Sequence, residues 1–472
     1  MADRPNIQFG TDGWRAIIAE DFTFENVRSC GEAVARNILA TGRADKGVVI
    51  GFDTRYGSDR FAHAVAEVIN GFGIATYTFH APAPTPACSF SVVDHDAANG
   101  VMITASHNPP EWNGFKVKSA EGGSSVPDEV ADIEAHLSRI LDGATSDIGA
   151  SIAKNKVFNV VAPYIEQLHR VIDVAPISSQ PLKVVIDAMH GSGAGMIPKV
   201  LAGGVIEVTE IRSEPNPNFP GMDQPEPIEH NLLPLSQAVK ELGADIGIAL
   251  DGDADRVGIV DENGKYFSTL EVFSLLTDHF MGRKNETGGV ACTITMSSMV
   301  DKLSENYGAP VFRTPVGFKY VGPTMIENGC SMGGEESGGY AFKGHVPERD
   351  GSLSGLLFLE AMVMSGKKPS ELLTDLHSLV GPHTFRRKDL AYDEARRAEL
   401  TERIASVQPE SLGGLALESE DRRDGVRFNL SGGSWAVVRM SGTEPLIRVY
   451  AETSDQPTLD AVLKDLRSTL RL

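Results

Sequence analysis

The sequence contains a hydroxyl side chain in a turn that prolines restrain. Ser106 lies in the segment TASHNPP at 104–110, directly after an apolar run that ends at Ile103. Ligands of α/β domains bind where strands end, and a serine at such a place can carry a transferred phosphoryl group as phosphoserine. An ordinary turn capped by Ser106 or Asn108 explains the segment equally well when it is taken alone.

Two neighbours of Ser106 in the sequence could act with it. His107 is adjacent, but consecutive side chains of an extended turn point apart, so we expect no direct bond between them. We interpret His107 as a residue that shapes the loop or contacts phosphate. Lys116 follows ten residues after Ser106 and could return to the same pocket. A lone lysine usually lies in solvent, and it becomes a base only if burial or nearby cations lower its pKa.

Three carboxylates occur at alternate positions in the segment DGDADR, at Asp251, Asp253 and Asp255. The segment follows the apolar residues 246–250. Carboxylates this close repel one another strongly unless a cation binds them, and oxygen ligands at this spacing suit a hard cation such as Mg²⁺. An EF-hand loop is excluded, because Arg256 occupies its glycine position and the apolar run VGIV continues where the loop would turn.

A glycine-rich segment, GGEESGG at 333–339, brackets two acids and a serine. Glycine permits close approach of the backbone, and Glu335 and Ser337 can hydrogen-bond vicinal hydroxyls, so the segment is a candidate sugar-binding loop. A mobile acidic turn is the alternative. His345 and Arg349 follow within fifteen residues and form a polar cluster that favours a binding site.

Two further segments could bind anions. The segment RMSGTEP at 439–445 lies between two predicted strands. Backbone N–H groups around a Gly turn, two hydroxyls and a guanidinium form a good phosphate cradle, whereas a hairpin turn explains only the glycine and the proline. The residues of this predicted cradle are Arg439, Ser441, Gly442 and Thr443. Near the N-terminus, Arg15 ends the Gly-flanked turn FGTDGWR and could face an anion, which is a weaker signal.

These segments must be positioned by alternating strands and helices. Apolar runs at 47–52, 182–188 and 289–295 predict strands, and a helix and a second strand follow each of them. Three such units indicate three related α/β domains with parallel or mixed sheets. The last part of the chain predicts an α+β unit, with strands at 415–418, 425–430, 434–440 and 446–452 and helices at 393–406 and 458–467. The predicted domains are 1–150, 151–262, 263–375 and 376–472.

Two other segments need an interpretation. Residues 213–235 hold six prolines, but interleaved acids, Phe219 and an immediate helix favour an ordered excursion over a disordered linker. The segment GSGAG at 191–195 is similar to a dinucleotide-binding fingerprint. Its spacing fails because Met196 stands where the third glycine is required, so no dinucleotide site is expected.

Composition excludes several classes of function. The chain has 472 residues, enough for three or four domains, with 43 Lys plus Arg and 64 Asp plus Glu, and its formal charge is −21. So acidic a chain disfavours general binding to nucleic acid or to anionic membranes, and positive charge for an anionic substrate must be local. No membrane span and no signal peptide are predicted. Four scattered cysteines favour a cytoplasmic location without a disulfide framework or a zinc site.

Taken together, the chemistry-bearing segments resemble the α-D-phosphohexomutase family, which includes phosphoglucomutases and phosphomannomutases. The matching stretches are FGTDGWRA, TASHNPPEWNGFKVK, DGDADR, TPVGFKY, GGEESGG and RMSGTEPLIRVY. They run from residue 9 to residue 450 in the family's order and approximate spacing. The resemblance implies three related mixed α/β domains and a C-terminal α+β domain around a central active-site cleft.

The resemblance also implies roles for individual residues. Ser106 matches the phosphoserine, whose oxygen completes an Mg²⁺ site with the three aspartates, and Lys116 matches the proposed general base. Arg15 and Arg256 match basic residues near that phosphate, and His107, which follows Ser106 directly, is a further candidate catalytic residue. The candidate substrate-binding residues are Lys319, Glu335, Ser337, His345, Arg349, Arg439, Ser441, Gly442 and Thr443.

A member of this family passes a phosphoryl group from phosphoserine to a hexose monophosphate and then takes back the other phosphate of the bisphosphate. Glu336 resembles the glucose-phosphate members, so glucose 1-phosphate and glucose 6-phosphate are the expected substrates, while Gly338 and Gly339 leave mannose phosphates open. The expected cofactors are Mg²⁺ and glucose 1,6-bisphosphate, as intermediate and activator. One alternative is a glucose 1,6-bisphosphate synthase with a separate phosphoryl donor. The other is a non-catalytic sugar-phosphate sensor. No oligomeric state is predicted.

Overall fold

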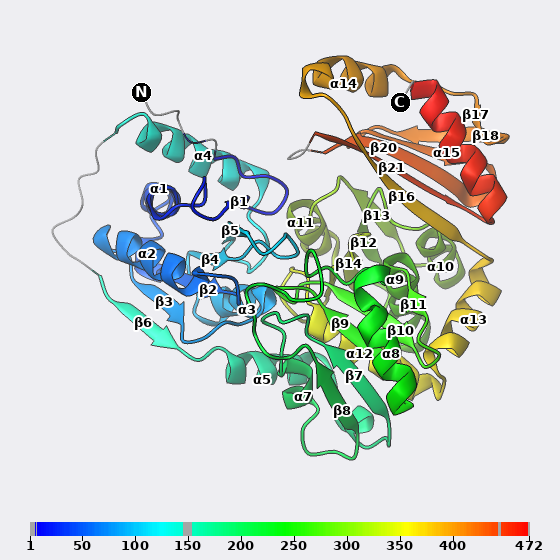
Figure 1. The fold of residues 1–472 in the computed structure, drawn as a ribbon, viewed down its shortest axis with the longest axis horizontal. Helices are drawn as coiled ribbons and strands as arrows, with labels where there is room; N and C mark the ends of the chain where they lie inside the picture. The colour runs from blue at the N-terminus through cyan, green and yellow to red at the C-terminus, as the bar shows by residue number, and fades with distance from the viewer. Residues whose placement is uncertain (1–4, 6, 145–152, 442–444, 471–472) are drawn as a thin grey trace.

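Four sheets with their helices make up the described part of the chain (Figure 1). The structure is a computed structural model, and it describes residues 5, 7–144, 153–441 and 445–470. In Figure 1 the first sheet lies at the left, the second at the bottom, the third at the right, and the fourth above the third. The predicted architecture of three mixed α/β domains and a C-terminal α+β domain is confirmed.

The first sheet mixes parallel and antiparallel strands. Its strands are β1 (Trp14–Ile17), β2 (Val48–Phe52), β3 (Thr76–Phe79), β4 (Asn99–Ile103), β5 (Trp112–Lys118) and β6 (Asn155–Phe158). Their order is β1-β5-β4-β2-β3-β6, and β5 is antiparallel to both β1 and β4 while the other pairs are parallel. Its helices are α1 (Phe24–Ala40), α2 (Ser58–Gly71), α3 (Thr85–Asp94) and α4 (Pro127–Leu141).

The second and third sheets repeat this plan with fewer strands. The second is β11-β10-β9-β7-β8 and the third is β13-β12-β14-β15. The elements of the second domain are α5 (Val161–Val171), α6 (Ala175–Ser178), β7 (Lys183–Asp187), α7 (Met196–Val200), β8 (Glu207–Ile211), α8 (Leu233–Leu242), β9 (Ile246–Leu250), β10 (Val257–Asp261) and β11 (Tyr266–Phe267). Those of the third are α9 (Thr269–Asp278), β12 (Val290–Thr293), α10 (Met299–Tyr307), β13 (Val311–Thr314), α11 (Phe318–Asn328), β14 (Met332–Gly334), β15 (Tyr340–Phe342), α12 (Gly351–Ser365) and α13 (Pro369–Val380).

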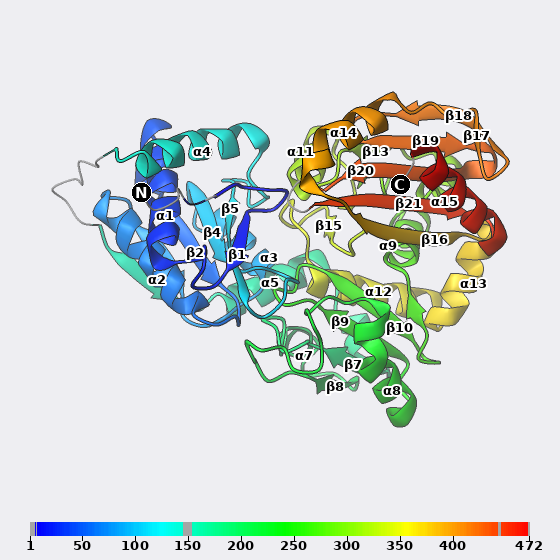
Figure 2. The same ribbon diagram turned by 45° about the horizontal axis from the view of Figure 1, so that its top comes forward.

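The fourth sheet is antiparallel throughout, in the order β16-β21-β20-β19-β18-β17. Its elements are β16 (Thr384–Ala391), α14 (Arg397–Ser406), β17 (Ser411–Leu412), β18 (Leu415–Asp421), β19 (Val426–Leu430), β20 (Ser434–Met440), β21 (Leu446–Thr453) and α15 (Gln456–Leu470). Helices α14 and α15 pack on this sheet and share one apolar core with it (Figure 2).

The candidate segments occupy the same kind of turn in the first three sheets. Residues 104–111 join β4 to β5, residues 251–256 join β9 to β10, and residues 335–339 join β14 to β15. In each case a parallel strand is followed by its antiparallel neighbour. The chemistry-bearing residues therefore lie at the carboxyl ends of parallel strands, where α/β sheets bind ligands.

Apolar side chains form one large core through the first three sheets and a second core under the fourth. On β20, Trp435 and Val437 belong to the large core, whereas Ala436 and Val438 belong to the second. Alternate side chains of a strand point to opposite faces, so strand β20 is buried on both faces of the fourth sheet. Among the described residues, no helix has both the length and the apolar character that a membrane span requires.

The strand–helix–strand units of the first three domains agree with the prediction, and α10 is the helix of the third unit. Strand β16 was not predicted, because Arg386, Arg387 and Lys388 interrupt its apolar pattern. The proline-rich segment 213–235 is ordered: Phe219 in its turns is fully buried, a short 3₁₀ helix follows at Glu229–Leu232, and α8 begins at Leu233. The predicted helix that began at residue 393 starts as α14 at Arg397, after a short 3₁₀ turn.

The first sheet extends beyond the predicted domain boundary at residue 150, since β6 pairs with β3. The boundary at 262 likewise precedes β11, which pairs with β10, and the boundary at 375 lies inside α13. Sheet pairing therefore crosses the first two predicted boundaries and a helix crosses the third. The boundaries stay predictions.

Candidate active site

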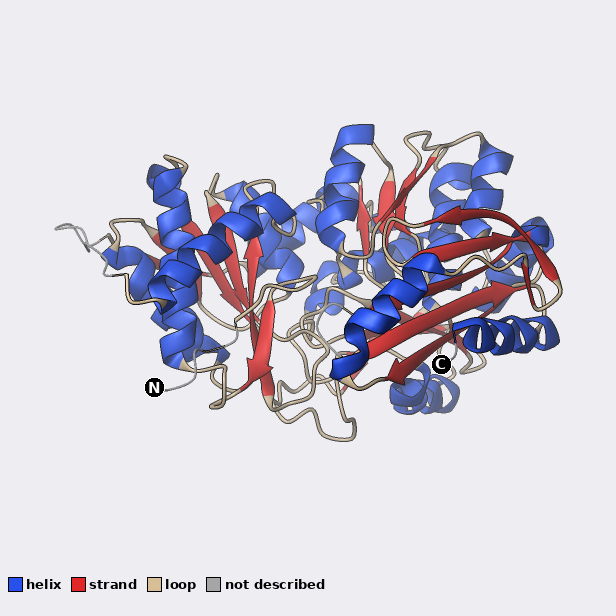
Figure 3. Ribbon diagram, turned by 90° about the horizontal axis from the view of Figure 1, so that it is seen from above, coloured by secondary structure: helices blue, strands red, loops and turns tan. Residues whose placement is uncertain are grey.

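Loops of the first three domains meet at the three aspartates, and Figure 3 shows loops gathered between the N-terminal sheet and the rest of the molecule. Ser106 Oγ of the first domain donates to Asp251 Oδ2 of the second at 3.1 Å. Arg349 Nη2 of the third domain lies 2.8 Å from Asp255 Oδ2. All four side chains are buried. The structure therefore brings together residues that are far apart in the sequence.

The backbone of Ser106 is left-handed, with φ 52°. This conformation costs a non-glycine residue roughly 1–2 kcal/mol. Because the turn is not extended, Ser106 Oγ and His107 Nδ1 lie 3.3 Å apart. The expectation that these two side chains do not meet is therefore wrong. Burial and the charges of Arg256 and Arg15 hold the pKa of His107 well below its usual value, so its ring is neutral at neutral pH.

Lys116 lies on β5, and antiparallel pairing of β5 with β4 returns it to the Ser106 turn. Its Nζ lies 2.7 Å from Asp12 Oδ2, 2.9 Å from Asp253 Oδ2 and 3.3 Å from Asp255 Oδ2. Burial lowers the pKa of Lys116, but these three carboxylates outweigh it and raise the pKa above its usual value. In this arrangement Lys116 is an ammonium group, so the lowered pKa that a base requires is not met.

The three aspartates fit a divalent cation. One oxygen of each lies within 4.8 Å of the others. Burial, followed by the charges of Asp253 and Asp255, raises the pKa of Asp251 well above its usual value. The Oδ1 atoms of Asp253 and Asp255 are buried and accept no hydrogen bond within the described residues. Buried anionic oxygens without donors are costly, and hard cations prefer oxygen ligands, so this donor set suits Mg²⁺.

Hydrogen bonds from backbone N–H groups hold the aspartate turn in its conformation. Asp251 Oδ1 accepts hydrogen bonds from the N–H groups of Asp255 and Arg256, at 3.0 and 3.1 Å. The segment GSGAG packs against the same turn, where Ser192 N donates to Gly252 O at 3.0 Å. A Cβ at Gly191 would lie 2.6 Å from Gly252 O. The glycine at 191 therefore permits close packing of two turns.

Asp12 is a central residue that the sequence analysis did not select. Its Oδ2 lies 2.7 Å from Lys116 Nζ and 2.6 Å from Arg349 Nη2. Burial alone would raise the pKa of Asp12. The positive charges of Lys116 and then Arg349 outweigh burial, so the pKa of Asp12 lies well below its usual value. Asp12 lies in FGTDGWR, the same segment as the candidate Arg15. The signal in the sequence is an acidic residue between Gly10 and Gly13, in a segment that matches the family.

A second buried ion pair, between Lys118 Nζ and Glu348 Oε2 at 2.7 Å, also went unpredicted. Both side chains have no exposed surface. The two residues are 230 positions apart in the chain, and no pattern in the sequence links them. This pair joins the first domain to the third beside the aspartate cluster.

Two arginines border the cluster. Arg15 Nη1 donates to Asn108 Oδ1 at 2.7 Å, which places it at the Ser106 turn. Arg256 Nη1 donates to Glu226 Oε1 at 3.1 Å, and its Nε lies 3.9 Å from Asp251 Oδ2. That Nε is buried and has no hydrogen-bond partner in the described part of the chain. Both guanidinium groups can therefore face an anion bound near Ser106.

The predicted sugar-binding loop is a closed turn. Glu335 N donates to Gly339 O at 3.1 Å, and Glu335 Oε1 accepts from Gly317 N at 2.9 Å. Ser337 is partly exposed in the same turn. Glu336 Oε1 accepts from Arg387 Nη1 of β16 at 3.2 Å, so the turn is attached to the fourth sheet.

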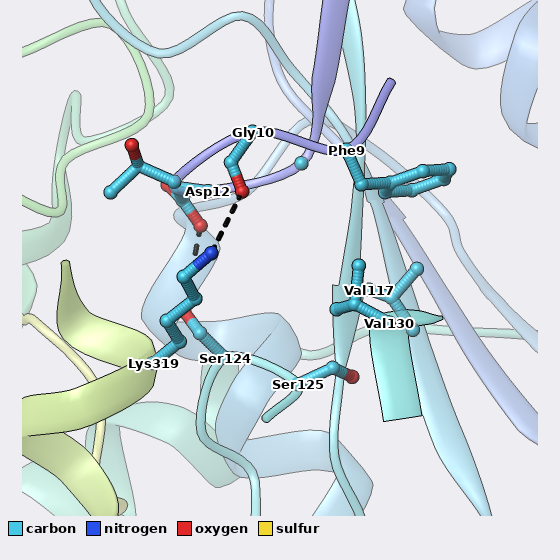
Figure 4. Close-up of a pocket in the computed structure, with 10 residues that line it drawn as sticks. Phe9, Gly10, Asp12, Val117, Ser124, Ser125, Val130 and Lys319 are labelled. Atoms are coloured by element: carbon cyan, nitrogen blue, oxygen red, sulfur yellow. Dashed lines mark hydrogen bonds between the residues drawn. The ribbon is translucent and has the colours of Figure 1, made fainter. Parts of the chain in front are cut away.

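Lys319 reaches the N-terminal turn from α11. Its Nζ donates to Gly10 O at 3.3 Å, as Figure 4 shows. The two residues line a small pocket together with Asp12, Ser124 and Ser125. Because Asp12 also binds Lys116 and Arg349, this pocket adjoins the charged cluster.

The structure does not bring His345 to the aspartates. Its side chain has no exposed surface, and its Nε2 lies 3.0 Å from Asp350 Oδ2. Tyr164 OH of α5 donates to the same oxygen at 2.6 Å. His345 thus packs against α5, and its role as a substrate contact stays a prediction that this burial does not support.

In the fourth domain, Arg439 is already bound to a carboxylate. Its Nε donates to Asp424 Oδ2 at 3.1 Å, and the same oxygen accepts from Val316 N at 3.0 Å. Ser441 is buried, and its N–H donates to Leu446 O at 2.8 Å. Gly442 and Thr443, the remaining predicted cradle residues, lie outside the described residues.

Comparison with protein families gives matches over nearly the whole chain. The four domain models of phosphoglucomutase/phosphomannomutase match in order: alpha/beta/alpha domain I at residues 6–143, domain II at 162–264, domain III at 271–379, and the C-terminal domain at 388–469.

Individual relatives cover almost all of the chain as well. A phosphoglucomutase/phosphomannomutase of Thermococcus kodakarensis is 33% identical over 449 residues, 95% of each chain. A phosphoglucosamine mutase of Cereibacter sphaeroides is 31% identical over 469 residues, 98% of each chain. A crystal structure from Thermus thermophilus, provisionally named a phosphomannomutase, superposes with a TM-score of 0.85 at 33% identity and covers 99% of both chains.

Millimolar Mg²⁺ is expected to raise the unfolding temperature of the protein. A cation at about 100 times its dissociation constant stabilises the folded state by roughly 2.7 kcal/mol. Replacement of Asp253 by Asn should abolish most of this shift, because it removes one ligand charge. Differential scanning calorimetry with and without Mg²⁺ measures the effect.

The exposed Asp45→Asn variant is the matched control and should keep the full shift. Equal stabilisation of the wild type and the Asp253→Asn variant would show that the cation binds elsewhere.

Proposed function

Since the chain belongs to the phosphoglucomutase/phosphomannomutase family of phosphohexomutases, we propose that it interconverts glucose 1-phosphate and glucose 6-phosphate. The observation that carries this proposal is the position of Ser106, whose Oγ lies 3.1 Å from a buried aspartate triad. A serine beside a cation site in a buried turn suits the carrier of a phosphoryl group. Mannose phosphates are further candidate substrates.

In the proposed reaction the phosphoryl group passes from Ser106 Oγ to the free hydroxyl of a hexose monophosphate. The Oγ–P bond breaks as the new P–O bond forms, and the hydroxyl proton passes to a base. The bisphosphate reorients and returns its other phosphate to Ser106, so the cycle consumes no external donor. Mg²⁺ held by Asp251, Asp253 and Asp255 would neutralise charge on the transferred group.

Lys116 is the residue that we propose to move the proton. Two of the three carboxylates that raise its pKa, Asp253 and Asp255, are the proposed cation ligands. When these carboxylates bind a cation, they stabilise the Lys116 ammonium less, and the pKa of Lys116 falls in the direction that a base requires. The buried position of Lys116 beside the Ser106 turn supports this assignment.

Two groups of residues support phosphate binding in the proposed reaction. Arg15, His107 and Arg256 lie near Ser106 and would hold the phosphate in transfer. The far phosphate would be held by the predicted cradle of the fourth domain. Contacts to the sugar itself would come from the loop at 335–339 and from Lys319 and Arg349.

A second substrate class has support from a relative. The Cereibacter sphaeroides protein that shares 31% identity is named a phosphoglucosamine mutase. Glu336 favours glucose phosphates, and its bond to Arg387 partly neutralises the charge that would attract a glucosamine ammonium group. Parallel coupled assays with glucose 1-phosphate, mannose 1-phosphate and glucosamine 1-phosphate, with and without the matching bisphosphate, decide between the classes.

The same assays separate the mutase from a sensor, and an assay of bisphosphate formation with candidate phosphoryl donors separates it from a synthase. A bisphosphate synthase would accumulate glucose 1,6-bisphosphate from a hexose phosphate and a separate donor. A sensor would bind sugar phosphate without turnover. The buried serine, aspartates and lysine together favour the mutase, because a sensor needs no phosphoryl carrier.

Purified protein is expected to carry a phosphoryl group on Ser106. Intact-mass analysis and peptide mapping should find the modified fraction there, and Ser106→Ala should lose both the modification and turnover. Ser468→Ala changes the same residue type on α15, where the exposed hydroxyl donates to Lys464 O, and should behave as wild type. Full turnover in Ser106→Ala would contradict the proposal.

Replacement of Lys116 by Met should lower kcat by about 10²-fold or more, the usual scale for loss of a general base. The phosphorylated fraction of Ser106 should still form on incubation with glucose 1,6-bisphosphate, which intact mass measures. Lys464→Met, on the exposed side of α15, is the control. If kcat of Lys116→Met stays within a few-fold of wild type, another group moves the proton.

Replacement of Arg439 by Ala should increase escape of the bisphosphate. A charge-assisted contact contributes roughly 1.5–3 kcal/mol, which is a ten- to hundredfold weaker grip at about 1.4 kcal/mol per tenfold. When the bisphosphate leaves, it takes the phosphoryl group with it and the enzyme stays unphosphorylated. The variant should therefore need more added glucose 1,6-bisphosphate and show a raised KM for glucose 1-phosphate.

Steady-state assays over a range of bisphosphate concentrations measure this dependence. Arg386→Ala removes an exposed arginine that pairs with Asp460 and should leave it unchanged. An Arg439→Ala enzyme with wild-type KM and wild-type bisphosphate dependence would remove this residue from the phosphate cradle.

A further inference from the structure

One buried arginine binds the backbone of the Ser106 turn at four places. Arg55 follows strand β2, and its side chain has no exposed surface. Its Nη2 donates to Ser106 O and to Asn108 O, each at 2.6 Å. Its Nη1 donates to Pro109 O at 2.8 Å and to Trp112 O at 3.0 Å. A single guanidinium group thus binds four carbonyls between residues 106 and 112.

Residues 53–55 also hold the backbone N–H of Ser106, through Thr104. Ser106 N donates to Thr104 Oγ1 at 2.8 Å, and Thr104 Oγ1 donates to Asp53 Oδ2 at 2.6 Å. Asp53 Oδ2 lies 3.3 Å from Arg55 Nε. Both peptide groups of Ser106 are therefore tied to residues 53–55, which keeps this residue at φ 52°.

The proline-rich segment of the second domain covers Arg55. The ring of Phe219, which has no exposed surface, lies 5.0 Å from the guanidinium carbon. Gly252 and Pro225 of the second domain pack closely against the Ser106 turn. A Cβ at Gly252 would lie 2.5 Å from Ser106 O and 3.1 Å from Pro225 Cγ. The Ser106 turn is thus enclosed between Arg55 and the second domain.

From these contacts we propose that Arg55 is a positioning residue for phosphoryl transfer, and that Phe219 holds it in place. This inference rests on the proposed function, in which Ser106 carries the phosphoryl group. Arg55 reaches no reacting atom and acts through the backbone of the turn. A guanidinium group has five donors in a planar fork, whereas a lysine has a single ammonium on a flexible stem. Lysine at this position cannot keep all four carbonyls bound.

The closing experiment compares Arg55→Lys with Arg60→Lys, which makes the same change on an exposed arginine that stacks on Phe24. Arg55→Lys should lower kcat at least about tenfold, since small displacements of a reacting group are costly. Its KM for glucose 1-phosphate should stay within about threefold, because other loops hold the sugar and the far phosphate. Arg60→Lys should leave both constants unchanged.

Hydrogen exchange followed by mass spectrometry gives a readout that needs no turnover. Arg55→Lys should speed exchange in peptides that cover 104–113, with the rest of the molecule unchanged, and Arg60→Lys should not. Phe219→Leu keeps the charge and the hydrogen bonds, so it should cause the same two changes to a smaller extent, about two- to fivefold in kcat. In the Arg55→Lys background Phe219→Leu should have no further effect.

The outcomes separate this inference from the proposed function. If the wild type turns over no hexose phosphate, the proposed function fails, and the exchange data alone decide whether Arg55 holds the turn. If Arg55→Lys does not fold, Phe219→Leu carries the same test. Unchanged kcat together with unchanged exchange at 104–113, in whichever of these variants folds, would overturn the proposal.

Discussion

Three carboxylates buried in one turn require positive charge close by, and the rest of the site supplies it. Two unit charges about 4 Å apart repel by roughly 4 kcal/mol at an effective dielectric constant near 20. Lys116 of the first domain and Arg349 of the third supply positive charge at hydrogen-bond distance. Removal of one partner from such a cluster leaves an uncompensated buried charge. The packing of the first three domains and the balance of charge in the site therefore depend on each other.

Sheet topology explains how such distant residues meet. In the first three sheets the chain leaves a parallel strand, makes the functional turn and returns as an antiparallel neighbour. Each turn is thus held by hydrogen-bonded strands on both sides, and its ends cannot separate. Lys116 illustrates the benefit, since β5 carries it back beside the turn that β4 began. A crossover helix at this point would have taken the chain to the other end of the sheet.

The sequence was sufficient to predict those parts of the site that lie within one short segment. Ser106 and the aspartates could be selected because their residue types and spacing already imply chemistry. Arg55 and Glu348 could not, because their partners lie far away in the chain and only the packed fold supplies them. Asp12 lies in a selected segment, but its partner Lys116 comes from the packed fold.

Local geometry and charge account for the remaining differences. The prediction about His107 assumed an extended backbone, and the left-handed φ of Ser106 reversed it. The prediction about Lys116 depended on its pKa, which three carboxylates from two other segments determine. Strand β16 was hidden because its charged side chains form ion pairs, as Arg387 does with Asp389 and Glu336.

On the ribosome, the strands of the first three sheets are all synthesised before β16, which begins at Thr384. The aspartates and their buried counter-charges can therefore assemble while the last part of the chain is still being translated. Until β20 docks, the surface that will receive Trp435 and Val437 stays open to water. Apolar surface of this kind makes nascent and truncated chains prone to aggregation and dependent on chaperones. A chain that ends between Val380, the last residue of α13, and Thr384 would thus keep all residues of the charge cluster and leave this apolar face exposed.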